Sequence, residues 1–94
     1  MEFFDFNGKV VLEFFGNSCL NCQMMTPIMN NIEYIMSNIR FYRINADARP
    51  DLVQKFNITS LPTLLLFNNN QLVSTIVGVK SQHVLQAMIN QALI

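Results

Sequence analysis

The sequence predicts an α/β protein with a four-stranded mixed sheet and helices on both faces, in the order β-α-β-α-β-β-α. Three observations lead to this fold class. A nearly continuous apolar run over 10–15 is typical of a central strand covered on both faces. The long helical pattern that follows implies a parallel crossover to the next strand. Two apolar runs flanking Asn68-Asn69-Asn70 predict an antiparallel hairpin, because asparagine tolerates the backbone conformations of tight turns.

The first strand and the first helix are separated by a sharp break in the apolar pattern. Gly16-Asn17-Ser18 interrupts the run, and we expect the helix to extend from about Cys19 to about Asn38. Pro27 lies inside this helix and is expected to bend it, because proline removes one backbone hydrogen bond and crowds the previous turn. Four isoleucines recur with helical spacing and are expected to form its inner face: Ile28, Ile32, Ile35 and Ile39.

The chain after the first helix contains five further elements. Residues 40–45 predict a second strand, and Pro50 suits the first turn of a short helix. The runs 63–67 and 71–77 predict the two hairpin strands, and Ser81 can cap a last helix. The short helix is expected to turn three residues inward: Leu52, Val53 and Phe56. The last helix is expected to turn five inward: Val84, Leu85, Met88, Ile89 and Ala92.

Length and charge limit the classes of function. Ninety-four residues predict a single domain over 1–94, since there is no room for two hydrophobic cores. The net charge is zero and no basic patch is present, so nucleic acid is not an expected partner. The apolar runs are too short for a membrane span, and the acidic start Met1–Lys9 does not resemble a secretory signal. We therefore expect a cytoplasmic protein with no membrane partner, and a processed secreted chain with a new Met is the alternative. The protein is also expected to be a monomer.

The most informative motif is Cys19-Leu20-Asn21-Cys22, which contains both cysteines of the chain. In a reducing compartment such a close pair is more often catalytic or metal-binding than a structural crosslink. A crosslink over so short a loop would also constrain the unfolded chain very little. A zinc site needs more ligands than this pair and the lone His83, which is expected on the surface of the last helix, so zinc would require a dimer. No bound metal is expected.

With these residues in place, the sequence resembles the thioredoxin family from about Lys9 to the C-terminus. The cysteine pair alone is moderate evidence, and several further residues at the family's spacing strengthen it. In the first half of the chain, Glu13 matches a buried carboxylate of the family, Phe15 an aromatic residue, and Pro27 a proline that kinks the helix. The segment Arg43–Asp47 matches the family's third-strand segment. Further on, Leu61-Pro62-Thr63 matches the cis-proline loop, and Gly78 matches a glycine near the site.

The sequence also departs from the family at several positions. Ser18 stands where tryptophan usually precedes the first cysteine, and Leu20-Asn21 replaces the usual Gly-Pro. Asn70 replaces the usual hairpin glycine, and the N-terminal strand and helix of full-length thioredoxins have little counterpart. These differences bear on the choice of partner and on the redox potential rather than on the type of chemistry.

The resemblance implies separate roles for the two cysteines. Cys19 is expected to lie exposed at the helix N-terminus, where unpaired backbone N–H groups lower the pKa of its thiol and make it the attacking nucleophile. Cys22 would resolve the mixed disulfide, and Glu13, with its pKa raised by apolar surroundings, would accept the Cys22 proton. A solvent-facing Glu13 is the alternative. The resemblance also implies a cis Leu61–Pro62 bond. The substrate-binding set would be Ser18, Leu20, Asn21, Leu61, Pro62 and Gly78.

The implied function is a thiol–disulfide oxidoreductase that reduces protein disulfides through Cys19 and Cys22. It would hold no bound cofactor, only the redox-active disulfide Cys19–Cys22. NADPH and flavin would act through a partner, a thioredoxin-reductase-like flavoprotein. Two alternatives stay open: a dedicated redox partner of one client, favoured by Ser18 and Leu20-Asn21, and a binding module that keeps the fold without general reductase activity. A glutaredoxin is disfavoured because the lysine and aromatic pattern of its motif is absent.

Overall fold

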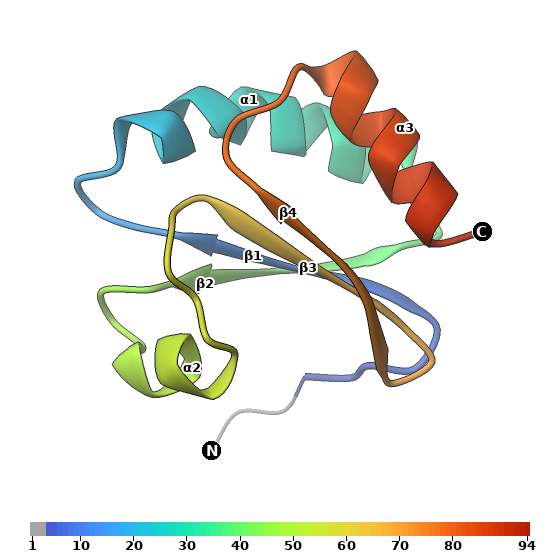
Figure 1. Cartoon of the computed structure of the whole chain (residues 1–94). Helices are drawn as coiled ribbons and strands as arrows, with labels where there is room; N and C mark the ends of the chain where they lie inside the picture. Colours follow the sequence, from blue (N-terminus) through green and yellow to red (C-terminus); the bar gives the residue numbers. More distant parts are fainter. Residues whose placement is uncertain (1–3) are drawn as a thin grey trace.

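The structure, a computed structural model, describes residues 4–94. Residues 1–3, where the acidic N-terminus discussed above begins, lie outside the described residues. Figure 1 shows a central sheet with helices packed against it. The strands are β1 (Lys9–Phe15), β2 (Arg40–Asn45), β3 (Thr63–Asn68) and β4 (Gln71–Val77). The helices are α1 (Leu20–Ile35), α2 (Pro50–Lys55) and α3 (Gln82–Ala92).

The sheet is mixed, with the strand order β2-β1-β3-β4. β1 is parallel to β2 and antiparallel to β3, and β3 is antiparallel to β4. The predicted element order, crossover and hairpin are therefore confirmed. β1 lies inside the sheet and is covered on both faces, which explains why its sequence is an almost unbroken apolar run. Phe15 is paired with Asn45, so β1 and β2 end side by side.

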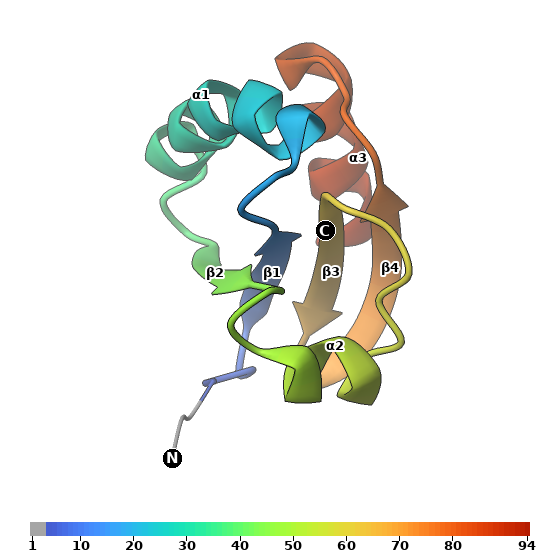
Figure 2. The ribbon, with the colours of Figure 1, turned by 90° about the vertical axis from the view of Figure 1, so that its left-hand side faces the viewer.

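Helices cover both faces of the sheet, as predicted. Figure 2 shows α1 and α3 on one side of the sheet and α2 on the other. The α1 and α3 face holds an aliphatic and methionine core, which includes Val11, Met25, Met29, Ile32, Leu64, Leu66, Leu85 and Ile89. The α2 face holds a second core that includes Val10, Leu12, Phe14, Ile44, Leu52, Leu65 and Phe67. Alternate residues of β1 point to opposite cores, as a pleated strand requires. Across residues 4–94, no helix is long and apolar enough to cross a lipid bilayer.

Two helix predictions need correction. α1 ends at Ile35 rather than near Asn38, and its buried face is centred on Met25 and Met29. The isoleucine stripe lies at the edge of that face, so Ile35 is exposed and only Ile32 is fully buried within the helix. In α3, Val84 is also exposed, while Leu85 and Ile89 fill the core. In both helices the expected apolar face is rotated relative to the face that packs on the sheet. The end of α1 is a separate error in the length of the helix.

The turn between β3 and β4 shows why asparagines occur there. Asn69 and Asn70 have φ values of 49° and 69°, in the left-handed region that most side chains avoid. Asparagine enters this region more easily than other non-glycine residues, so Asn70 can replace a turn glycine. Asn68 belongs to β3 and not to the turn, which is one residue shorter than the sequence suggested.

Candidate active site

The two cysteines form a disulfide at the N-terminal end of α1, with their Cα atoms 5.2 Å apart. Cys19 is the residue that caps the helix, and its Sγ accepts a hydrogen bond from the backbone N–H of Cys22 at 3.1 Å. Cys22 lies one turn further and is only 3% exposed. Cys19 was expected to be exposed, but it is half-buried. The accessible sulfur is therefore Cys19, and Cys22 lies behind it.

The helix start leaves a positive local field at Cys19. The chain leaves β1 at Phe15, turns through 16–18, and enters α1 with Cys19 as its cap. The first turn of α1 contains no acidic side chain that would neutralise the positive end of the helix dipole. At this helix end, the N–H group of Cys22, which lies in the first turn, donates to Cys19 Sγ.

The Leu61–Pro62 peptide bond is cis, which confirms the prediction for this loop. Pro62 is buried, and its carbonyl oxygen accepts a hydrogen bond from the Gly78 N–H at 2.9 Å. Gly78 has a φ of 89°, a left-handed conformation that suits glycine. This bond joins the loop before β3 to the end of β4, so the structure brings Pro62 and Gly78 together.

Gly16 brings the cis-proline loop against the disulfide. A Cβ atom added to Gly16 would lie 2.9 Å from Leu61 Cδ1 and 3.7 Å from Cys19 Cβ. A side chain at this position would have to displace Leu61. The bare backbone of Gly16 thus allows Leu61 to approach the base of Cys19, and it places these two predicted site residues around one corner, with Pro62 next to Leu61 in the chain.

Glu13 is buried inside the sheet layer, being 1% exposed, so the solvent-facing alternative is wrong. It lies opposite Arg43 in the parallel pair of β1 and β2, and Arg43 Nε donates to Glu13 Oε1 at 3.1 Å. Burial raises the pKa of Glu13 above its ordinary value, while the charge of Arg43 works in the opposite direction. Within the described chain, the other carboxylate oxygen, Oε2, is buried and has no hydrogen-bond partner.

Glu13 and Cys22 belong to the same layer, between the sheet and α1. Val11, two residues before Glu13 on β1, packs in the core with Met25, one turn after Cys22 on α1. Side chains two residues apart on a strand share a face, so Glu13 also points toward α1. Arg43 is partly exposed and reaches the buried Glu13 carboxylate from the solvent side. Its guanidinium lies 4.8 Å from the centre of the Phe15 ring.

The surface around Cys19 is apolar on the helix side. Leu20 is 70% exposed and Met24, one turn later, is 54% exposed, while the neighbouring Ser18 and Asn21 are exposed polar residues. Leu20 and Met24 are four residues apart on a helix and therefore lie on the same side of α1. Together they form an apolar ridge next to the disulfide, which we call the Leu20–Met24 ridge.

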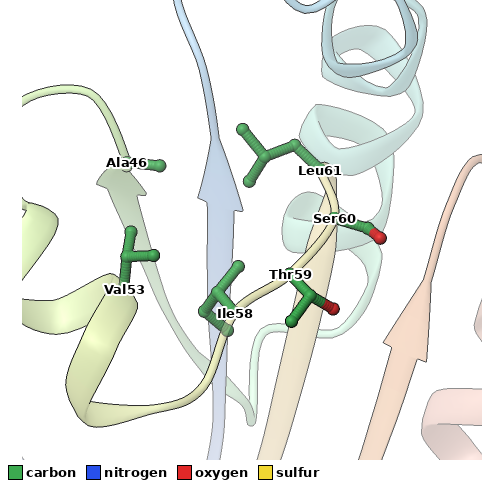
Figure 3. A pocket seen from close by; sticks show the side chains of 6 residues that line it. All are labelled: Ala46, Val53, Ile58, Thr59, Ser60 and Leu61. Atoms are coloured by element: carbon green, nitrogen blue, oxygen red, sulfur yellow. The ribbon is translucent and has the colours of Figure 1, made fainter.

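A pocket of about 330 Å³ lies on the other side of Leu61. Figure 3 shows its lining, which comes from the end of β2, from α2 and from the loop before the cis-proline: Ala46, Val53, Ile58, Thr59, Ser60 and Leu61. Of these residues, only Leu61 was expected at the site. The pocket is formed by three segments that are distant in the sequence, so no local sequence pattern predicts it.

Among residues 4–94, the histidine, cysteine and acidic side chains do not form a metal centre. His83 is exposed on α3, as expected of a surface helix residue. Over residues 4–94, no group of three or more histidine, cysteine or acidic side chains is arranged to hold a metal ion.

A half-buried sulfur at a helix N-terminus, disulfide-bonded to a buried one and flanked by a cis-proline loop, defines a small dithiol–disulfide exchange protein. The chain belongs to the thioredoxin family, whose model matches residues 2–91. It is accordingly a thiol–disulfide oxidoreductase.

Two thioredoxins are among the proteins that are similar to this chain. A thioredoxin of Chlamydia caviae is 33% identical over 84 residues, which are 89% of this chain and 82% of that protein. The structure of oxidised mitochondrial thioredoxin 3 from Saccharomyces cerevisiae is 28% identical with a TM-score of 0.84, covering 90% of this chain and 79% of that one. A Caenorhabditis elegans peptide-N(4)-(N-acetyl-beta-glucosaminyl)asparagine amidase is 33% identical over 87% of this chain, which spans only 14% of that longer protein.

Proposed function

We propose that this oxidoreductase reduces disulfides in protein clients, with Cys19 as the attacking residue and Cys22 as the resolving residue. The observation that carries the proposal is the unequal placement of the two sulfurs. Cys19 caps α1 where no acidic side chain offsets the helix dipole, and Cys22 is buried one turn behind it. The first position favours an accessible thiolate, and the second favours a thiol that reacts only with its neighbour.

The exchange has two steps. The Cys19 thiolate attacks one sulfur of the client disulfide, the client S–S bond breaks, and the other client sulfur leaves as a thiolate that takes up a proton. The Cys22 thiolate then attacks Cys19 Sγ and displaces the remaining client thiolate. The Cys19–Cys22 disulfide forms, and two electrons have passed from the dithiol to the client. Because the second step is intramolecular, the nearness of the two cysteines accelerates it.

Glu13 is proposed as the group that takes the Cys22 proton before the second step. A buried carboxylate with a raised pKa is matched to proton transfer near neutral pH better than an exposed one. Arg43 occupies Oε1, which leaves the unpartnered Oε2 as the oxygen that can accept the proton. In this proposal Arg43 orients the carboxylate and does not itself touch the sulfurs.

Clients are proposed to bind across the corner formed by Cys19 and the cis-proline loop. Leu20 and Asn21 contact the client on the helix side, with Ser18 before the attacking sulfur, and Leu61, Pro62 and Gly78 contact it on the other side. An extended client segment can pair with the backbone of this loop as an added strand. The Leu20–Met24 ridge and the pocket beyond Leu61 would then take apolar side chains on either side of the client disulfide.

The oxidised protein has to be reduced again after each cycle. We propose that a thioredoxin-reductase-like flavoprotein does this with NADPH, in the cytoplasm, and that the protein acts as a monomer with no cofactor of its own. A second candidate is a dedicated partner of one client. It is favoured by the exposed Leu20, which gives the ridge next to Cys19 a bulky apolar side chain.

The proposal is tested by the reduction of insulin disulfides by dithiothreitol, followed by turbidity. Wild-type protein is expected to accelerate the reaction and Cys19→Ser is expected to show only the background rate. A wild-type rate equal to that of Cys19→Ser contradicts general reductase activity. Turnover with a thioredoxin reductase and NADPH separates the two candidates, because a dedicated partner would react with dithiothreitol and not with that enzyme.

A further inference from the structure

We propose that Asn17, Asn45 and Asp47 form a positioning ring that fixes the segment 16–18 and thereby holds Cys19 within reach of Cys22. The three residues lie where two neighbouring strands end: Asn45 is the last residue of β2 and is half-buried, while Asn17 and Asp47 follow β1 and β2 and are exposed. They would act on the redox site through the backbone and not by touching a client. Their importance for turnover rests on the proposed function, but their effect on the disulfide itself does not.

The ring is closed by three hydrogen bonds. The Asn17 backbone N–H donates to Asp47 Oδ2 at 2.7 Å. The Asp47 backbone N–H donates to Asn45 Oδ1 at 2.9 Å. The Asn45 side-chain amide, Nδ2, donates to Asn17 Oδ1 at 2.8 Å. Each residue therefore donates one hydrogen bond and accepts another.

The ring continues the connection between β1 and β2 beyond the point where the sheet ends. Phe15 and Asn45 are the last paired residues of the two strands, and the Ala46 N–H still donates to the Phe15 carbonyl oxygen at 2.7 Å. After this bond, the segment that follows β1 leads to α1 and the segment that follows β2 leads to α2. The ring joins these two segments, so the residues that lead to Cys19 are connected to the loop that leads to α2.

Gly16 allows the ring to approach the cysteine closely. The point that a Cβ atom of Gly16 would occupy lies 3.3 Å from Asp47 Oδ2 and 3.7 Å from Cys19 Cβ. The Asp47 carboxylate thus lies directly beside the turn that carries Cys19. The segment has no large buried side chain of its own, since Asn17 and Ser18 are exposed and Gly16 has none. Hydrogen bonds, rather than packing, have to hold it.

The physical consequence falls on the Cys19–Cys22 disulfide. Cys22 is fixed by its burial in α1, but Cys19 is the cap residue and follows the position of the segment before it. The tendency of two thiols to form a disulfide depends on how often their sulfurs meet in the right geometry. Loosening the segment would therefore lower the equilibrium constant for disulfide formation without altering either sulfur.

The test compares Asp47→Ala with Asp47→Asn, because asparagine can still accept the Asn17 hydrogen bond and alanine cannot. The quantity measured is the equilibrium constant for the reaction of the protein dithiol with oxidised glutathione, which gives the protein disulfide and two molecules of reduced glutathione. We expect about a threefold to tenfold decrease for Asp47→Ala, where tenfold corresponds to about 30 mV for a two-electron couple. Asp47→Asn is expected to stay within about twofold of the wild type.

Three results would overturn the proposal: no change in Asp47→Ala, an equal decrease in both variants, or a decrease in Asp47→Asn alone. An equal decrease would mean that the charge of Asp47, and not its hydrogen bond, sets the equilibrium. Asn45→Ala, which breaks two ring bonds but keeps the Asn17–Asp47 bond, provides a second reading if Asp47→Ala fails to fold by circular dichroism. It is expected to decrease the constant relative to the wild type, because it removes the bond between Asn45 and Asn17, and no decrease overturns the proposal. The insulin assay of the wild type decides the proposed function independently.

Discussion

The two sides of the Cys19–Cys22 disulfide differ in solvent exposure and in the residues that surround each sulfur. On the outer side, Cys19 is half-buried and its neighbours Leu20 and Met24 are exposed. On the inner side, Cys22 is buried among the core residues, with Met25 in the next turn and Glu13 on the facing strand. One sulfur can therefore meet a client, whereas the other can meet only its partner and the protein interior.

The difference shows how four residues can provide two separate chemical functions. In the proposed exchange, the outer side would control which client disulfide reaches Cys19, through contacts that cost little stability to change. The inner side would control how quickly Cys22 completes the exchange, through buried groups that also support the fold. Substitutions on the outer side are expected to alter recognition, and substitutions on the inner side are expected to alter stability or the resolving step.

The largest stability difference is expected between the adjacent residues Met24 and Met25. Met25→Ala leaves a cavity in the core and is expected to lower the free energy of unfolding by about 2–5 kcal/mol. Met24→Ala removes an exposed side chain and is expected to change it by less than about 0.5 kcal/mol. Urea unfolding followed by circular dichroism measures both. Equal losses would show that the two sides of α1 do not differ as described.

The next effect is expected at Glu13. Glu13→Gln keeps the shape and a hydrogen-bond acceptor for Arg43, but an amide cannot take the Cys22 proton. The rate of mixed-disulfide resolution is expected to fall by roughly 100-fold near neutral pH, the lower range for loss of a general base. Stopped-flow kinetics with a fluorescent disulfide substrate measures this rate. Asp51→Asn, which alters an exposed carboxylate on α2, is the control and is expected to leave it unchanged.

The same variant is expected to be more stable than the wild type at alkaline pH. Burial raises the folded-state pKa of Glu13, so the folded protein binds this proton more tightly than the unfolded chain does. The stability contribution of Glu13 is therefore lost as pH rises from the unfolded value of 4.5 through the raised folded value. Glu13→Gln avoids a buried charge and is expected to gain on the order of 1 kcal/mol at alkaline pH. A gain that does not grow between acid and alkaline urea titrations argues against this account.

The smallest effect is expected on the outer side, at Leu20. Leu20→Ser removes the apolar part of the ridge next to Cys19 and is expected to raise the KM for insulin by about threefold to tenfold, for the loss of roughly 1 kcal/mol of apolar contact. The kcat and the rate with a small-molecule disulfide are expected to stay the same. Val84→Ser, an exposed apolar residue on α3, is the matched control. An unchanged KM would remove the ridge from the client-binding surface.

The sequence allowed most of this architecture to be predicted, because strong local patterns carried it. Residues 40–45 form β2 within the bounds expected, and the spacing of Cys19 and Pro62 to other residues located the disulfide and the cis bond through the family resemblance. The end of α1 was misplaced because Ile39 continues the isoleucine spacing and is buried, although the helix has already ended at Ile35. Local periodicity shows that a helix has an apolar stripe, but the packing partner decides which stripe is buried.

Features that depend on contacts between distant segments could not be predicted in this way. The pairing of Glu13 with Arg43 depends on the register of β1 against β2, and 30 residues separate them in the sequence. The pocket beyond Leu61 and the ring at Asp47 likewise require two or three loops to converge. The family pattern marks Glu13, Arg43 and Leu61 as residues of interest, but their contacts with distant segments are fixed only by the sheet.

The most direct test of the difference between the two sulfurs is a trapping experiment with Cys19→Ser and Cys22→Ser. Each reduced variant is mixed with a disulfide-bonded peptide, quenched with acid and analysed by intact-protein mass spectrometry. Cys22→Ser is predicted to accumulate a mixed disulfide through Cys19, because attack proceeds and resolution cannot. Cys19→Ser is predicted to accumulate none, because Cys22 is buried. Equal trapping by the two variants, or trapping by Cys19→Ser alone, would contradict the assignment of Cys19 as the attacking residue.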